Sequence, residues 1–445
     1  MNRRRFASEE EWLPLSSGQQ FHWDLSLRQP STPDMKIVLA VLVKGYSTEA
    51  LASAVRAVVH KHVSLRMRFR SVGGTWLQAL SATEALDIVV RTDDPPSKDW
   101  SSREALESCV AWYAQQGLGA GAAQAVANAV VEMKAYPFDL TRELPTRAVL
   151  ISHGEQTVSL VVGMHHAAAD AYSFAPLLRD IAAFARGEVE SGVVDERFLT
   201  YAYGQAARLR TQAETQLSYW SSLLRQNPRA AASSYLDGEA KACQVLAAQL
   251  ADTSGGSRFR QAPFMGAIAQ ALQACDRLDE TYVLTTTANR WSAAESDIVG
   301  CFYKHLVWRP PGGAIDPGAA SRDFVGQTLR SARHLDVTLD MIIERYHQDT
   351  GAFPALQACL SFRDLSTVQL PGGQGDAFLP IPMLGTIVQQ RVAYHMHVTV
   401  EPDRLSAAQV SRFDYLDASS AKQLFDEFRK RTSGVAAPDD VALQH

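Results

Sequence analysis

The sequence predicts a two-lobed protein of the α/β (α+β) class. Apolar, β-branched runs typical of strands alternate with segments of helical periodicity along nearly the whole chain. The alternation occurs in both halves, which favours layers of sheet and helix in each. A polar stretch at 187–193 is the candidate boundary. We therefore expect an N-terminal lobe of residues 1–187 and a C-terminal lobe of residues 188–445 with segments that bridge back to the first.

In the N-terminal half, cap residues and periodicity define the expected elements. Ser17 and Ser47 stand where helix N-caps belong, and Leu51 and Val55 share one face of the helix that begins at Thr48. The other elements expected here are strands at 35–44, 63–69, 76–79, 86–90, 147–152 and 158–162, the last two paired as a hairpin, and a surface helical hairpin at 103–134 with a glycine-rich break at 117–121.

The C-terminal half repeats this mixture. The sequence predicts strands at 244–250, 282–287, 302–308, 358–362 and 395–400, and helices at 198–224, 262–276, 322–347 and 418–432. Loops rich in Gly and Pro are expected at 309–318 and 371–382, and the last dozen residues are expected to be disordered.

Composition excludes several classes of function. The chain has 43 Lys and Arg against 48 Asp and Glu, a net charge of −5, with no basic block typical of nucleic-acid binding. The five cysteines show no CxxC spacing, which favours a reduced, cytoplasmic protein. No apolar run approaches the ~20 residues of a membrane span, and the N-terminus lacks the apolar core of a signal peptide.

The candidate site lies in residues 157–178, TVSLVVGMHHAAADAYSFAPLL. An apolar strand pattern at 158–162 leads to His165 and His166, and Asp170 follows where a helix N-cap belongs. Taken singly, each residue fits a structural role, since a histidine can pack in a core. Taken together, they also fit chemistry, because an imidazole with a pKa near 6.5 suits proton transfer at neutral pH.

A metal site is not expected in this protein, and the scattered cysteines fit a metal-free chain. Adjacent strand residues point to opposite faces, so His165 and His166 cannot easily bind one ion. The chain also lacks an HExxH motif or another helical His pair.

Around the histidine pair the sequence resembles the condensation domains of nonribosomal peptide synthetases, which share a chloramphenicol-acetyltransferase-like fold and the pattern HHxxxDG. Residues 164–173 read MHHAAADAYS. The likeness extends over about residues 13–432, because further stretches follow the family's order: 15–20 (LSSGQQ), 62–69 (HVSLRMRF), 137–140 (PFDL), 144–147 (LPTR), 201–203 (YAY), 219–220 (YW), 288–290 (ANR), 299–302 (VGCF) with Arg309, and 334–337 (HLDV).

The resemblance implies two similar lobes that meet in a V around a central tunnel. It implies that His166 is catalytic, that His165 supports it, and that Asp170 is structural and paired with Arg290. The side chains that it places as candidates along the tunnel are Ser17, Gln20, Ser173, Tyr303 and His305.

The sequence departs from the family pattern at two places. Ala171 replaces the usual Gly after the acid, which is tolerable unless that residue needs a positive φ. Residues 303–305 (YKH) replace the family's Val-Asn-Thr, which alters one substrate-facing strand. No adenylation or carrier domain flanks the likeness, so the expectation is a free-standing monomer that meets its carrier proteins in trans.

The leading hypothesis is acyl or aminoacyl transfer from a carrier-bound phosphopantetheine thioester to an amine or alcohol, without a cofactor bound to the enzyme. A second hypothesis is an alcohol O-acyltransferase that uses acyl-CoA or a polyketide carrier; the absence of a DFGWG motif counts against the plant type. A third is a non-catalytic, carrier-binding recruitment module. The sequence does not distinguish amide from ester formation.

Overall fold

The structure is a computed structural model, and it describes the chain over most of its length. The described residues are 12–28, 35–81, 86–92, 103–189, 192–226, 228–231, 241–250, 259–364, 371–373, 376–381, 389–390, 392–400 and 405–432. The last dozen residues, expected to be disordered, lie outside this set.

Contacts between residues divide the chain into two compact units. The first comprises residues 1–208, 288–303 and 368–386, and the second comprises 209–287, 304–367 and 387–445. The division falls inside the long helix α6 (Arg197–Arg225), whereas the boundary expected from sequence was at residue 187. Two later segments belong to the first unit, and one of them, residues 288–303, carries functional-site residues.

The first unit is built on a six-stranded sheet in which β7 (Thr157–His165) lies between β2 and β6. Its order is β14 (Gly372–Gly373), β15 (Asp376–Pro380), β2 (Lys36–Lys44), β7, β6 (Thr146–Ser152) and β5 (Ile88–Thr92). Neighbours are antiparallel except the parallel pair β5–β6.

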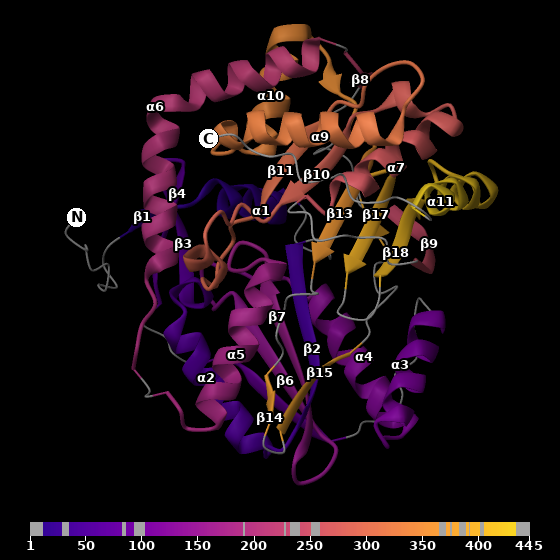
Figure 1. Ribbon diagram of the computed structural model, residues 1–445. Coiled ribbons are helices and arrows are strands. Elements are labelled where there is room, and N and C mark those ends of the chain that lie inside the picture. Colours follow the sequence, from indigo (N-terminus) through magenta and orange to yellow (C-terminus); the bar gives the residue numbers. More distant parts are fainter. Residues whose placement is uncertain are drawn as a thin grey trace. The chain divides into compact units, whose positions relative to one another are not determined.

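Helices cover both faces of this sheet (Figure 1). Alternate residues of β2 point to opposite sides, as the pleat requires. Val41 and Val43 pack with α2 (Thr48–Lys61) and α5 (Phe174–Ala185). Ala40 and Leu42 pack with the helices of the other face, α3 (Arg103–Gln115) and α4 (Ala120–Ala135).

The expected surface hairpin at 103–134 is therefore a covering layer of the core. Its helix α4 buries Ala123, Val126 and Val130 completely or nearly so. Gly163 of β7 faces α4, and a Cβ there would lie 2.6 Å from Met133 Sδ. The alanines and this glycine let the helix approach the sheet closely.

A small three-stranded sheet completes the first unit. Its order is β1 (Leu13–Pro14), β4 (Thr75–Leu80) and β3 (Met67–Val72). The strand expected at 63–69 begins only at Met67, because residues Val63–Arg66 form a 3-10 turn, η2. Helix α1 (Ser17–Arg28) packs its Trp23 into this part of the core.

The second unit has a seven-stranded sheet covered on one face by α7 (Ala262–Ala274), α9 (Pro317–Ser331) and α11 (Ala418–Thr432). The strand order is β11 (Lys304–Trp308), β10 (Val283–Thr287), β13 (Ala358–Asp364), β17 (Tyr394–Val400), β18 (Leu405–Arg412), β9 (Lys241–Leu250) and β16 (Gln389–Gln390). The other described elements of this unit are the C-terminal part of α6, α10 (Leu339–Thr350), the pair β8 (Ala230–Ala231) and β12 (Phe353–Pro354), and the short turns η5 (Leu278–Glu280) and η6 (Ala332–His334).

Other sequence expectations were also wrong in detail. Ser17 is the first residue of α1 rather than its cap, and Ser16 Oγ accepts from the Gln19 N–H at 3.2 Å. The helix expected at 322–347 is two helices, because α9 ends at Ser331 and Thr338 caps a new helix by accepting from the Met341 N–H. Strand β15 lies inside the expected loop at 371–382 and pairs with β2. Strand β18 was not predicted, and it is buried along most of its length between β17 and β9.

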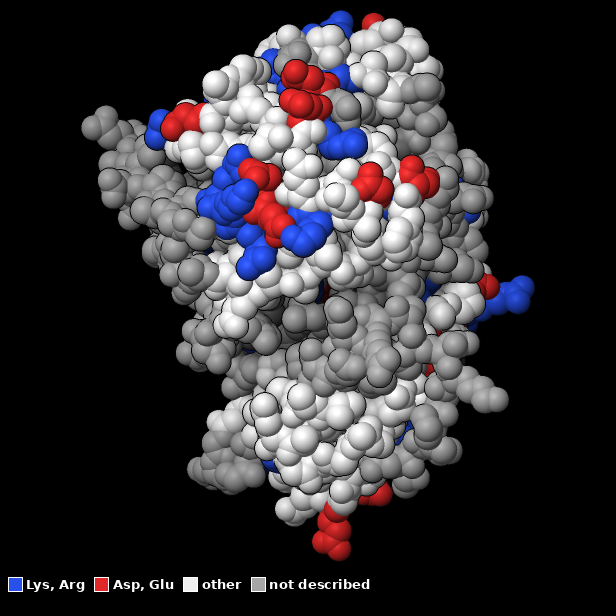
Figure 2. Space-filling view, turned by 90° about the vertical axis from the view of Figure 1, so that its right-hand side faces the viewer, with Lys and Arg blue, Asp and Glu red and all other residues white. Residues whose placement is uncertain are grey.

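Charge on the described surface is mixed. On the face that includes α11, Figure 2 shows basic and acidic side chains side by side. Lys422 pairs with Asp426, and Lys430 and Arg431 pair with Glu427, so the basic end of this helix is balanced. Among the described residues, no helix is both long and apolar enough to span a bilayer.

Candidate active site

The histidine pair lies at the end of the central strand of the first unit. β7 ends at His165, whose N–H donates to Pro145 O at 2.9 Å. The N–H of His166 donates to Met35 O at 2.8 Å. These bonds to the neighbouring strand segments fix the backbone as it leaves the sheet, and Ala168 N–H closes the turn onto His165 O at 2.9 Å.

His165 points into the core. Its ring meets Trp23 and Phe138 edge-on, at centroid distances of 6.0 and 6.2 Å. Its Nδ1 accepts a hydrogen bond from the Ala167 N–H at 3.1 Å, which places the ring proton on Nε2. Burial, and then the neighbouring His166 and Lys36, lower the pKa of His165 to about 3. His165 is therefore buried and neutral at neutral pH.

His166 keeps part of its surface accessible to solvent, unlike its neighbour. Its ring stacks on His22 of α1, with 3.9 Å between centroids and 10° between planes, and Tyr303 lies 5.2 Å away. Burial of the ring lowers the pKa of His166, and the Asp170 carboxylate acts in the opposite direction. The imidazole is consequently neutral at neutral pH and has a lone pair to accept a proton.

Asp170 is buried, and it joins the histidine loop to the helix that follows. Its Oδ1 accepts from the Ser173 N–H at 3.1 Å, in a reciprocal capping box of the short helix η3 (Ala171–Ser173). The same oxygen accepts from Arg290 Nη2 at 2.8 Å, and Oδ2 accepts from the Phe302 N–H at 3.0 Å. Asp170 therefore fixes the loop against residues 288–303, which fold back into the first unit.

Arg290 is the partner that the sequence resemblance implied, and its side chain is only 3% exposed. Besides Asp170, it donates to the backbone carbonyls of Glu295, Ile298 and Gly300, at 2.6, 2.6 and 3.2 Å. Phe302 lies beneath the guanidinium, 4.3 Å from ring centroid to Cζ. The arginine thus shapes the whole turn that contains the short helix α8 (Ala293–Ser296).

Two close approaches hold this turn in place. A Cβ on Gly300 would lie 2.1 Å from Phe198 Cδ2 of α6, so only glycine fits there. Ser64 Oγ donates to Val299 O at 2.9 Å. The segment that carries Cys301 and Tyr303 is thereby fixed beside His166.

The five side chains expected along a tunnel occupy different surroundings. Ser17 is buried, and its N–H donates to the Gln205 side chain at 2.8 Å. Gln20 donates to Asp24 within α1 at 2.7 Å. The remaining three are Ser173, which belongs to the Asp170 network, Tyr303, which lies beside His166, and His305, which lies on β11 in the second unit.

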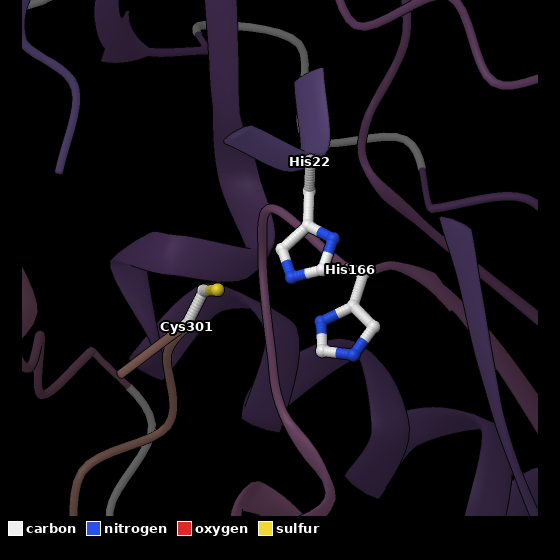
Figure 3. A group of neighbouring side chains, drawn as sticks. All are labelled: His22, His166 and Cys301. Carbon is white, nitrogen blue, oxygen red and sulfur yellow. The ribbon is translucent and has the colours of Figure 1, made fainter. Parts of the chain in front are cut away.

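His22 and Cys301 were not predicted as site residues. Figure 3 shows His22, His166 and Cys301 as one group, and one potential ligand atom from each lies within 4.8 Å of the others. No metal site was expected, because His165 and His166 are adjacent, no HExxH motif is present and the cysteines show no CxxC spacing. Here the three side chains come from α1, the loop after β7 and the 298–303 turn, a proximity that spacing in the sequence does not reveal.

Comparison with known proteins identifies the family. A model of the condensation domain matches residues 9–369. The isonitrile lipopeptide synthase of Mycobacterium tuberculosis is 25% identical over 464 residues, which cover 96% of this chain and 17% of that protein. The chain thus spans a small part of that relative's length.

Solved structures share the fold. A structure concerned with condensation domain-mediated chain release from the enacyloxin polyketide synthase matches with a TM-score of 0.67 at 18% identity, over 97% of this chain and 84% of that one. A mutant starter condensation domain of rhizomide synthetase in complex with C8-CoA also gives 0.67, at 15% identity and 96% coverage of both chains. The expected chloramphenicol-acetyltransferase-like α/β fold is confirmed. With the family model matching most of its length, the chain belongs to the condensation-domain family, whose members are acyltransferase-like.

Proposed function

We propose that this protein transfers an acyl or aminoacyl group from the phosphopantetheine thioester of a carrier protein to an amine or alcohol. The observation that carries the proposal is the state of His166. Its ring is partly accessible and neutral. The residue follows the central strand β7, on a loop that is fixed by Asp170 and Arg290. An imidazole in this state is suited to act as a general base.

In the proposed reaction, His166 removes the proton from the acceptor N–H or O–H as the nitrogen or oxygen attacks the thioester carbonyl. A tetrahedral intermediate forms, the C–S bond breaks, and the imidazolium returns the proton to the departing thiolate. Protons balance, and no covalent enzyme intermediate is needed. Positioning both substrates beside one fixed base lowers the barrier further through proximity.

The developing oxyanion needs hydrogen-bond donors, and the start of the helix after Asp170 is the candidate source. The N–H of Ser173 already donates to Asp170 Oδ1, so it is engaged by the cap. The N–H groups of His166, Ala167, Ala168 and Asp170 are engaged as well, so under this proposal the candidate donors for the oxyanion are the N–H groups of Ala169 and Ala171.

The carrier-borne donor is supported by the relatives. The matching curated protein is named as a lipopeptide synthase, and a matching structure concerns chain release from a polyketide synthase. The C8-CoA bound to a third relative supports acyl-CoA as the alternative donor. Both donors present the same thioester carbonyl to His166.

The test compares donors in one assay. The protein is incubated with an octanoyl carrier protein, with octanoyl-CoA, or with the octanoyl thioester of N-acetylcysteamine, each with a panel of amines and alcohols. Products are followed by mass spectrometry, with His166→Ala as the matched control. Product from the carrier-bound donor that requires His166 supports the proposal, whereas faster transfer from the CoA donor supports the alternative. Carrier binding without transfer from any donor would instead support the recruitment module.

A further inference from the structure

His22, His166 and Cys301 form a group of three potential metal ligands. The proposed acyl transfer uses His166 and gives no role to His22 or Cys301. His22 and Cys301 are buried, at 3% and 0% exposure, and His166 is half-buried. Figure 3 shows one nitrogen of each ring on the side where the Cys301 sulfur lies. Their potential ligand atoms all lie within 4.8 Å of one another.

The packing of α1 explains why the group exists. Gly18 and His22 are four residues apart and so share one face of this helix. A Cβ on Gly18 would lie 3.1 Å from Cys301 Sγ and 3.1 Å from Tyr303 O. The missing side chain lets α1 lie directly on the 301–303 segment, one turn before His22 meets His166.

We propose that His22, His166 and Cys301 form a binding site for a thiophilic divalent cation, with Zn²⁺ as the chemical type. Imidazole nitrogen and thiolate sulfur are both ligand types that zinc takes in proteins, and three protein ligands leave a fourth position for water. Binding releases the thiol proton of Cys301, because the thiolate is the ligand.

The geometry also predicts what changes on binding. The lone pairs of two stacked rings run side by side, whereas a tetrahedral ion needs them to converge. With metal–ligand bonds of about 2.0–2.3 Å, the ligand atoms must come to roughly 3.5 Å from one another. Occupancy therefore tilts the His22 ring relative to His166 and shortens the 4.8 Å span of the group.

A bound metal ion prevents His166 from acting as a base. This inference rests on the proposed function, in which His166 is the base. Whichever nitrogen of His166 binds the ion, the other nitrogen of the neutral ring carries the proton. No lone pair then remains to accept a proton from the acceptor. The site is inhibitory, and the metal-free protein is the active form.

Binding is tested without reference to activity. Metal-free protein is titrated with Co²⁺ in place of Zn²⁺ while absorption is recorded, since a cysteine ligand produces a thiolate-to-cobalt charge-transfer band. We expect one equivalent of Co²⁺ with this band, its loss in Cys301→Ser, and at least tenfold weaker binding in His22→Phe, which keeps the ring stack but removes the nitrogens. Cys275→Ser, a half-buried cysteine of the second unit, is the matched control and should bind as wild type does.

A charge-transfer band that persists in Cys301→Ser, or the absence of a band in the wild type, would overturn the site. The switch is tested separately with any donor that gives product. Zn²⁺ should inhibit the wild type, and at least tenfold more Zn²⁺ should be needed for His22→Phe. Equal inhibition of the two proteins would overturn the switch. If Co²⁺ binds as expected but no donor is used by the metal-free protein, the proposed function fails and the metal site stands.

Discussion

Asp170 and Arg290 form a buried ion pair at 2.8 Å, and both side chains are 3% exposed. They are 120 residues apart in the chain, yet both belong to the first unit. The pair does not stand alone, because Asp170 also accepts from the backbone N–H groups of Ser173 and Phe302. Through these bonds the pair links the histidine loop to residues 288–303.

Removal of this carboxylate should reduce stability strongly. In Asp170→Ala the guanidinium of Arg290 stays buried without its counter-charge, and two backbone N–H groups lose their acceptor. Breaking a buried pair in this way costs about 3–5 kcal/mol in the free energy of unfolding. Urea denaturation measures the loss.

An exposed ion pair in the same unit serves as the control. Arg179 and Asp297 lie 2.7 Å apart, and each side chain is 53% exposed. Asp297→Ala should change the free energy of unfolding by no more than about 1 kcal/mol, because solvent screens such pairs. If the two variants lose equal stability, the Asp170 pair does not hold the site as described.

Replacement of His166 should affect turnover rather than folding. The ring is half-buried at the start of the loop after β7, and under the proposed function it is the base. We expect His166→Ala to lower kcat by roughly 10²- to 10⁴-fold and to leave the unfolding midpoint nearly unchanged. A folded His166→Ala protein with full turnover would show that another group accepts the proton.

Many helices and strands of the fold could be predicted from local sequence patterns. The helix expected at 418–432 is found as Ala418–Thr432, and the Ser47 cap is present as expected. These features depend on residues close together in the chain. Strand β18 was missed because its small, mixed side chains, LSAAQVSR, fill a central sheet position that only the neighbouring strands define.

The site was predictable to the extent that one motif contains it. His165, His166 and Asp170 lie within six residues, and the resemblance supplied Arg290. His22 and Cys301 could not be found in this way, because their proximity to His166 depends on how α1 packs on the 301–303 segment. A close approach of this kind is a property of the folded chain.

The pH dependence of catalysis should reflect the lowered pKa of His166. Burial shifts it below the ordinary value of 6.5, so more than half of the base is neutral at pH 6.5 and protonation is completed only in more acidic solution. We expect the acid limb of kcat/KM to have its midpoint below pH 6.5. Titration of the ring by NMR gives the same pKa independently of turnover, and a midpoint at or above 6.5 would contradict the assignment.

Stability should also fall in acid because of His165. Its pKa is about 3 in the folded protein against 6.5 for an ordinary histidine, so between these values the unfolded chain binds a proton that the folded chain does not. The stability that depends on the neutral ring is present above pH 6.5 and is lost as the pH falls toward 3. At about 1.4 kcal/mol per pH unit, the loss reaches a few kcal/mol. His165→Phe, which keeps an aromatic ring, should show a shallower decline in unfolding free energy over this range, and an equal slope would contradict the prediction.

The close approach at Gly300 gives a prediction about packing alone. In Gly300→Ala the new methyl group would lie 2.1 Å from Phe198 Cδ2, and the Phe198 side chain is itself buried at 1% exposure. Either α6 or the 298–303 turn must shift, at a cost of about 1–3 kcal/mol in the free energy of unfolding. Phe198→Ala creates the missing space, so the double variant should be more stable than the sum of the two single losses predicts.

Gly312→Ala is the control, since no atom lies within 4 Å of its Cβ position and its stability should be close to that of the wild type. Additive losses in the Gly300 and Phe198 cycle would mean that the two residues do not touch in solution as they do in the structure.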